Sequence, residues 1–82
     1  MLKIETNKTG STFEISPMGK LEVSNASRLE IEVKSVLDKN PEAIGIDFER
    51  LRYIDSSGIS TLLRCANLAK KSGIKFGCYN VS

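Results

Sequence analysis

One short segment of the chain combines residue types that can accept a phosphate or hold a partner. Asp55, Ser56, Ser57 and Gly58 are consecutive, and they stand between an apolar run and a helical apolar pattern. Each of the three polar side chains can accept a hydrogen bond from a free N–H group of a first helical turn. Gly58 has no side chain, so another molecule can approach the backbone there. The segment is therefore either a plain helix cap or a serine site at the start of a helix.

A phosphate on one of these serines suits the start of a helix. The unpaired N–H groups and the positive end of the helix dipole both favour negative charge. A phosphoserine carries a charge of about −1.5 to −2 at neutral pH, and here it would stand beside Asp55. Modification would change which surface can dock at this point without unfolding the helix.

The composition argues against catalysis. The 82 residues include no histidine, which excludes a Ser-His-Asp triad, imidazole acid–base chemistry and histidine metal ligands. A nucleophilic Ser56 would need Lys70, Lys71 or a carboxylate as its base. Both lysines follow Ser56 by about four helical turns, roughly 20 Å along a helix axis. We expect a protein without enzyme activity, cofactor or metal.

Length and charge limit the remaining classes. We expect one domain, spanning residues 1–82. The formal net charge of +2 is too small to favour nucleic-acid binding, although Arg50, Arg52 and Arg64 could gather near the serines. No apolar run approaches the ~20 residues that cross a bilayer, and the N-terminus does not resemble a signal peptide. We interpret Cys65 and Cys78 as small apolar residues of a reduced, cytoplasmic protein.

The pattern along the chain predicts elements in the order β-β-α-β-α-β. Strands are expected at residues 2–6, 12–18, 43–48 and 74–81, and residues 51–54 are expected to form an extended connection. Helices are expected between Ser24 and Asn40 and between Ile59 and Ser72. The first two strands make an antiparallel hairpin, and the strand–helix–strand units imply parallel pairing elsewhere. The expected α/β fold is a two-layer sandwich, a mostly parallel four-stranded sheet with two helices on one face.

Each expected helix has an apolar stripe that should face the sheet. In the first helix the stripe comprises Ala26, Leu29, Val33, Val36 and Leu37. In the second helix it comprises Ile59, Leu62, Leu63, Ala66 and Ala69. The serine segment would then lie at the carboxyl end of a strand, where open α/β sheets usually place their sites.

Three segments together resemble the STAS domain family. They are Gly19-Lys20-Leu21-Glu22, Ile44-Gly45-Ile46-Asp47-Phe48 and Ile54-Asp55-Ser56-Ser57-Gly58-Ile59. The small free-standing form with Asp-Ser-Ser-Gly is most similar to the bacterial anti-sigma factor antagonists. The resemblance extends from about Phe13 to Val81, nearly the whole chain.

The resemblance implies a partner-switching module that is regulated by phosphorylation. Such a module binds a serine-kinase anti-sigma factor while unphosphorylated, which releases the sigma factor. The kinase then modifies the serine directly after the aspartate, which is Ser56 here, with Ser57 as the second choice, and a Ser/Thr phosphatase reverses the step. The resemblance also implies that Ser57 helps to cap the helix. The partner-binding residues it implies are Gly19, Lys20, Leu21, Glu22, Asp55, Ser57, Gly58 and Ile59.

The resemblance leaves two questions open. A STAS-type docking subunit of a transport ATPase or of a signalling scaffold, without a phosphorylation cycle, is the alternative function. Family members also usually continue with another helix and strand after the segment that matches Gly77 to Ser82. We therefore expect Leu68, Cys65 or Tyr79 to lie on an exposed patch that closes by self-association into a homo-oligomer.

Overall fold

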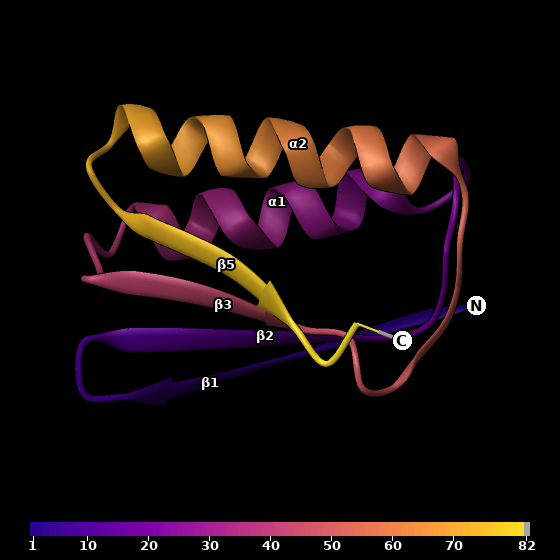
Figure 1. Cartoon of the computed structure of the whole chain (residues 1–82), viewed down its shortest axis with the longest axis horizontal. Coiled ribbons are helices and arrows are strands. Elements are labelled where there is room, and N and C mark those ends of the chain that lie inside the picture. The colour runs from indigo at the N-terminus through magenta and orange to yellow at the C-terminus, as the bar shows by residue number, and fades with distance from the viewer. Residues whose placement is uncertain (82) are drawn as a thin grey trace.

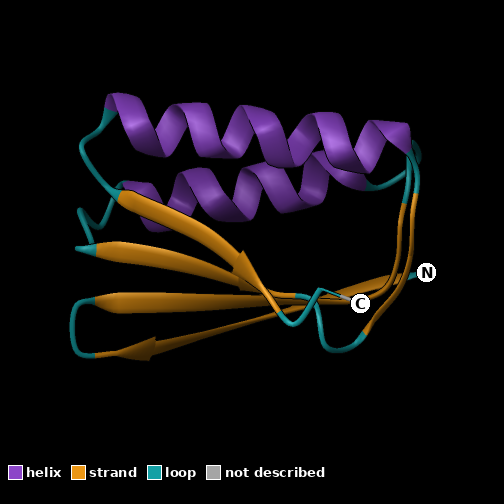
Figure 2. Ribbon diagram, in the orientation of Figure 1, coloured by secondary structure: helices purple, strands orange, loops and turns teal. Residues whose placement is uncertain are grey.

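A sheet of five strands carries both helices on one of its faces, in the computed structural model of the chain (Figures 1 and 2). The structure describes residues 1–81. The elements are β1 (Leu2–Thr9), β2 (Thr12–Leu21), α1 (Ala26–Leu37), β3 (Ala43–Asp47), β4 (Leu51–Ile54), α2 (Ser56–Lys71) and β5 (Lys75–Tyr79). The predicted two-layer α/β sandwich is confirmed. The predicted number of four strands is wrong, because residues 51–54 form a strand of their own.

Strand β2 is the centre of the sheet. It pairs antiparallel with β1 from Thr12 to Gly19, which confirms the hairpin. Its other edge pairs parallel first with β3, from Thr12 to Ile15, and then with β4, from Gly19 to Leu21. Strand β5 lies parallel to β3 on the far side. Because β4 takes up the edge of β2 beyond β3, β2 continues to Leu21 instead of ending at Met18 as predicted.

Pro17 lies where β2 passes from one parallel neighbour to the next. Gly19 donates its N–H to the carbonyl of Arg50 on the β4 side. Alternate residues of a strand point the same way, so the nitrogen of Pro17 also faces that side. It falls between Ile15, the last residue paired with β3, and Gly19, the first paired with β4. The missing N–H therefore leaves no ladder bond unmade, as predicted for an unpaired side.

The two helices pack on the sheet through different kinds of side chain. Helix α1 buries Ala26, Leu29, Val33 and Val36, as predicted. Helix α2 buries Gly58, Thr61, Cys65 and Ala69. The predicted stripe for this helix is therefore wrong at Ile59 and Leu63, which are 51% and 63% exposed. The buried face of α2 is made of small side chains, so its backbone comes close to the strands below it.

Helix α1 has 12 residues and α2 has 16. Within residues 1–81, no helix is both long and apolar enough to span a membrane.

Candidate functional site

The two segments predicted to form the site lie side by side at one edge of the sheet. Strands β2 and β4 run parallel, and their last residues, Leu21 and Ile54, are paired. The backbone N–H of Asp55 donates to the carbonyl of Leu21 at 3.2 Å. The chain leaving β2 and the chain entering α2 therefore rise together toward the starts of the two helices, at the right-hand end of Figure 1.

Asp55 fastens these two segments together. One carboxylate oxygen, Oδ1, accepts the backbone N–H of Gly58 at 2.9 Å and so caps α2. The other oxygen, Oδ2, accepts the backbone N–H of Val23 at 3.0 Å. Asp55 is therefore the N-cap among the candidates that the sequence offered, and the cap expected from Ser57 is not formed. Its second bond joins residues 32 positions apart in the chain.

Asn25 shapes the segment that follows β2. It is the N-cap residue of α1, but its side chain makes no capping bond to that helix. Instead, Oδ1 accepts the N–H of Glu22 at 3.0 Å, and Nδ2 donates to the carbonyl of Lys20 at 3.0 Å. Residues 20–23 are thus held by Asn25 from one side and by Asp55 from the other.

Leu21 and Gly58 form the buried support of the site. Leu21 is fully buried in the core, and Gly58 is buried against it. A Cβ atom on Gly58 would lie 2.7 Å from Ile54 Cγ1 and 2.9 Å from the Leu21 carbonyl oxygen. Neither residue offers a side chain to a partner, so we expect both to position the surface around them.

Gly19 also has a structural reason to be glycine. Its φ of +98° is a conformation that side-chain-bearing residues rarely adopt. A Cβ there would also collide with the carbonyl oxygen of Met1. The backbone turn at Gly19 accompanies the irregular register between Gly19 and Lys20, where β4 joins β2. Gly19 therefore sets the direction in which the following residues leave the sheet.

The remaining predicted residues face outward. Ser56 and Lys20 are exposed, Ser57 and Glu22 are half-buried, and Ile59 is 51% exposed. Ser56 and Ser57 line a shallow polar depression of about 320 Å³ between the starts of α1 and α2. The structure thus brings Val23, which directly follows Glu22, and both serines onto one surface, with the serine after the aspartate accessible.

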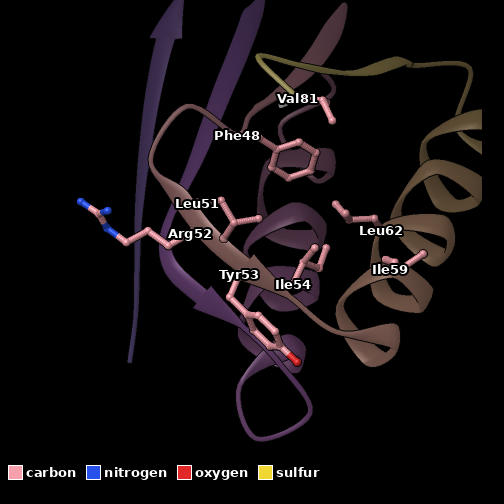
Figure 3. Close-up of a pocket in the computed structure, with 8 residues that line it drawn as sticks. All are labelled: Phe48, Leu51, Arg52, Tyr53, Ile54, Ile59, Leu62 and Val81. Carbon is pink, nitrogen blue, oxygen red and sulfur yellow. The ribbon is translucent and has the colours of Figure 1, made fainter.

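An apolar groove of about 510 Å³ lies on the other side of the same loop (Figure 3). Its lining residues are Phe48, Leu51, Arg52, Tyr53, Ile54, Ile59, Leu62 and Val81. Sequence reasoning missed this groove and expected an exposed patch at Leu68, Cys65 or Tyr79. Of these three, Tyr79 is 37% exposed and Leu68 is half-buried, whereas Cys65 is fully buried, and burial raises the pKa of its thiol to about 11. The apolar content of residues 51–54 was the sequence signal that could have indicated the groove.

The three arginines considered for nucleic-acid binding do not share one surface. Arg50 and Arg52 line a depression beside Gly19. Arg64 lines the polar depression with the two serines. The geometry therefore offers no continuous basic patch of these three side chains.

The STAS domain model matches residues 3–82 of the chain. The chain belongs to the STAS domain family. The match includes every segment on which the resemblance rested, together with the hairpin and both helices. No curated protein matches the chain in sequence.

Solved structures share the fold of this STAS domain. An anti-sigma factor antagonist from Mycobacterium paratuberculosis is 20% identical, with a TM-score of 0.85 over 95% of this chain and 66% of that one. The anti-sigma factor antagonist SpoIIAA, in its unphosphorylated form, is 22% identical, with a TM-score of 0.80 over 100% of this chain and 74% of that one. Mglu is 12% identical, with a TM-score of 0.86, and the alignment covers 95% of this chain but 19% of Mglu. At these identities the likeness shows the fold alone.

Proposed function

We propose that this STAS domain is a bacterial, cytoplasmic partner-switching module of the anti-sigma factor antagonist type. Unphosphorylated, it binds an anti-sigma factor that is also a serine kinase. The kinase transfers the γ-phosphoryl group of ATP to the Ser56 oxygen, which loses its proton as ADP leaves, and a Ser/Thr phosphatase removes the phosphate. The module has no catalytic activity of its own and contributes to transcription regulation only through these contacts.

The observation that supports this proposal is the pair of hydrogen bonds that the Asp55 carboxylate accepts. By accepting the N–H groups of both Gly58 and Val23, Asp55 ties the start of α2, with its exposed Ser56, to the segment that follows β2. A partner can therefore contact both segments at once. A phosphate of about −2 on Ser56 would place charge in the middle of that contact. Like a charge inserted into any interface, it would oppose docking of a surface matched to the neutral hydroxyl.

The kinase reaction should label a single residue. Incubation with ATP and a serine-kinase anti-sigma factor of the same host is expected to add one phosphate, and Ser56→Ala should abolish the addition. Intact-mass measurement followed by peptide mapping reads out both results. Ser57→Ala, a half-buried neighbour on the same turn, is the matched control and should be labelled like the unaltered chain.

Two outcomes would count against this assignment. Equal labelling of the Ser56→Ala protein would refute Ser56 as the acceptor, and loss of labelling in Ser57→Ala alone would move the site to Ser57. A complete absence of labelling, with neighbouring genes for a permease and a transport ATPase, would favour the alternative of a docking subunit without a phosphorylation cycle.

We also propose that the apolar groove seats a second copy of the chain. Tyr53, Ile59 and Val81 are 50%, 51% and 69% exposed along it. Within residues 1–81, β4 pairs with β2 on one edge, and no strand lies on the other edge beside the groove. Two such open edges can pair around a two-fold axis, which would cover both grooves at once.

Light scattering after size-exclusion chromatography tests this association. At high concentration we expect a dimer, and Ile59→Lys should convert it to monomer because a charge in the groove opposes burial. Ile31→Lys places the same charge on an isoleucine that is 66% exposed on α1, and it should leave the dimer intact. A monomer at every concentration for the unaltered chain would contradict the proposal.

A further inference from the structure

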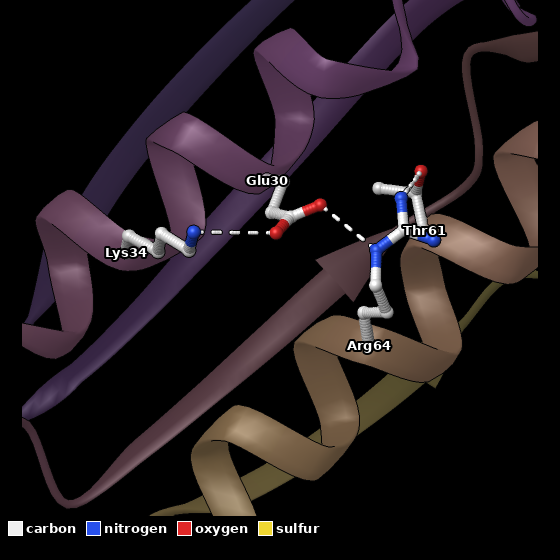
Figure 4. Close-up of polar contacts among 4 residues, drawn as sticks. All are labelled: Glu30, Lys34, Thr61 and Arg64. Carbon is white, nitrogen blue, oxygen red and sulfur yellow. Dashed lines mark hydrogen bonds and ion pairs between the residues drawn. The ribbon is translucent and has the colours of Figure 1, made fainter.

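Arg64 connects the two helices close to the serines. Its Nε donates to Oε1 of Glu30 on α1 at 3.1 Å, and its Nη2 donates to the hydroxyl of Thr61 at 2.9 Å (Figure 4). Glu30 also pairs with Lys34 at 3.3 Å. Since Thr61 precedes Arg64 by three residues, the guanidinium group is turned back toward the start of α2.

The side chain of Arg64 reaches the same depression as the serines. Hydroxyl-bearing side chains dominate the lining, which includes Ser27, Ser56, Ser57, Ser60 and Thr61. Among the described residues that line it, Arg64 is the one with a charge. A phosphate on Ser56 would therefore enter a depression whose lining includes a single cation, with the Asp55 carboxylate next to Ser56 in the chain and the Glu30 carboxylate paired with that cation.

The distances allow this cation to reach a phosphate. Ser56 and Arg64 are eight residues apart, about 12 Å along the helix axis. The guanidinium group already lies back at Thr61, five residues from Ser56, and the ester bond carries the phosphate oxygens further into the depression. The Arg64 side chain is 57% exposed, so it can rotate without disturbing the core.

A phosphate on Ser56 would bind Arg64 more strongly than the Glu30 carboxylate does. The guanidinium fork can hold two oxygens of a phosphate dianion, whereas it now makes one bond to the Glu30 carboxylate. Glu30 keeps one cation in the exchange, because Lys34 stays within ion-pair distance. The balance of charges thus favours transfer of Arg64 from the carboxylate to the phosphate.

We propose that Arg64 binds the phosphate on Ser56 and, in doing so, releases Glu30 and the link between α1 and α2. The proposal rests on the proposed phosphorylation, and it names what the modified site does within this chain. Phosphorylation would then act in two ways. It would add charge to the partner surface, and it would replace a contact between the helices with a contact along α2.

The test uses protein with phosphoserine incorporated at residue 56 during translation, so that no kinase is needed. Phosphorus NMR then follows the second ionisation of the phosphate, whose pKa is ordinarily about 6. We expect a pKa lower by roughly 0.5 than in the same protein with Arg64→Gln, since a cation a few ångströms away favours the dianion. Arg64→Lys, which keeps the charge but not the fork, should restore part of the difference.

A matched control and a second readout isolate the role of Arg64. Arg52→Gln removes an arginine that lines the apolar groove instead, and it should leave the phosphate pKa unchanged. In the unmodified chain the Arg64 guanidinium holds the pKa of the Glu30 carboxyl below its ordinary value, with help from Lys34. That pKa should rise on phosphorylation, because Arg64 leaves.

The failures of the two proposals are separable. Equal phosphate pKa values with and without Arg64, in proteins shown to be folded by circular dichroism, would overturn the role of Arg64 whatever a kinase does. Absence of kinase labelling would overturn the proposed phosphorylation while this measurement still reports on Arg64.

Discussion

Replacing Gly58 with valine is expected to destabilise the folded protein by about 3 kcal/mol or more, which is the upper range for forcing extra atoms into a packed site. The first added carbon would lie 2.7 Å from Ile54 Cγ1, 2.9 Å from the Leu21 carbonyl oxygen and 3.1 Å from Leu21 Cγ. The carbonyl oxygen cannot move aside freely, because it accepts the N–H of Asp55. Relief would therefore require α2 to shift away from the ends of β2 and β4.

Thermal unfolding measures this effect. For a domain of this size, each 1 kcal/mol corresponds to roughly 4–8 °C in Tm, so we expect a fall of roughly 12–24 °C. Gly77→Val is the matched control, because a Cβ on Gly77, in β5, meets no atom within 4 Å. Valine is also a good strand residue, so the Tm of that control should stay within a few degrees of the unaltered chain. Equal falls in Tm for the two substitutions would show that Gly58 has room for a larger side chain beside Ile54 and Leu21.

The close approach at Gly58 also explains why the buried face of α2 was predicted wrongly. The sequence pattern favours the large apolar residues Ile59, Leu62 and Leu63 as the inward stripe. In the structure, the inward positions hold small residues, which permit the helix backbone to lie near Leu21. Hydrophobicity alone cannot rank a glycine or a threonine as buried, since their burial depends on the distance between helix and sheet.

Strand β4 illustrates a second limit of prediction from a local sequence pattern. Its four residues are too few to show a period, and half-buried and exposed residues do not alternate along them. What makes them a strand is the edge of β2 that β3 leaves unpaired beyond Ile15. The longer elements, the hairpin and α1, carried clear periods and were predicted, although β1 extends to Thr9 and β2 to Leu21, beyond the predicted ends at residues 6 and 18. Strand β4 depends on long-range pairing, which a local pattern does not contain.

The candidate site likewise has features that the local sequence predicts and features that depend on long-range pairing. The local sequence was sufficient to place a cap and a serine at the start of a helix. It left the choice of cap open among Asp55, Ser56 and Ser57, because all three side chains can accept the same N–H group. The bond from Val23 to Asp55 decides the choice, and it joins a loop after β2 to the loop after β4. Only the parallel pairing of those strands brings the two donors to one carboxylate.

Asp55→Ala should therefore cost more than the loss of an ordinary cap. Removing the carboxylate leaves the N–H of the buried Gly58 without its acceptor at 2.9 Å and the N–H of Val23 without its acceptor at 3.0 Å. A lost cap costs about 1 kcal/mol, and a lost hydrogen bond to a charged group costs about 1.5–3 kcal/mol. We expect a total of about 3 kcal/mol in the free energy of unfolding, measured by urea denaturation.

Amide hydrogen exchange separates the two bonds of Asp55. In Asp55→Ala the amide of Val23 should lose its protection, because its acceptor lies in the removed side chain. Asp55→Asn keeps one oxygen but replaces the other with an NH₂ donor, so it should retain one of the two protected amides. Its destabilisation should therefore be about half of that of Asp55→Ala. Asp38→Ala, at the exposed carboxyl end of α1, should change stability by less than about 0.5 kcal/mol. If Val23 stayed protected in Asp55→Ala, its segment would be held by Asn25 alone, and the joint surface on which the partner-switching proposal rests would not need Asp55.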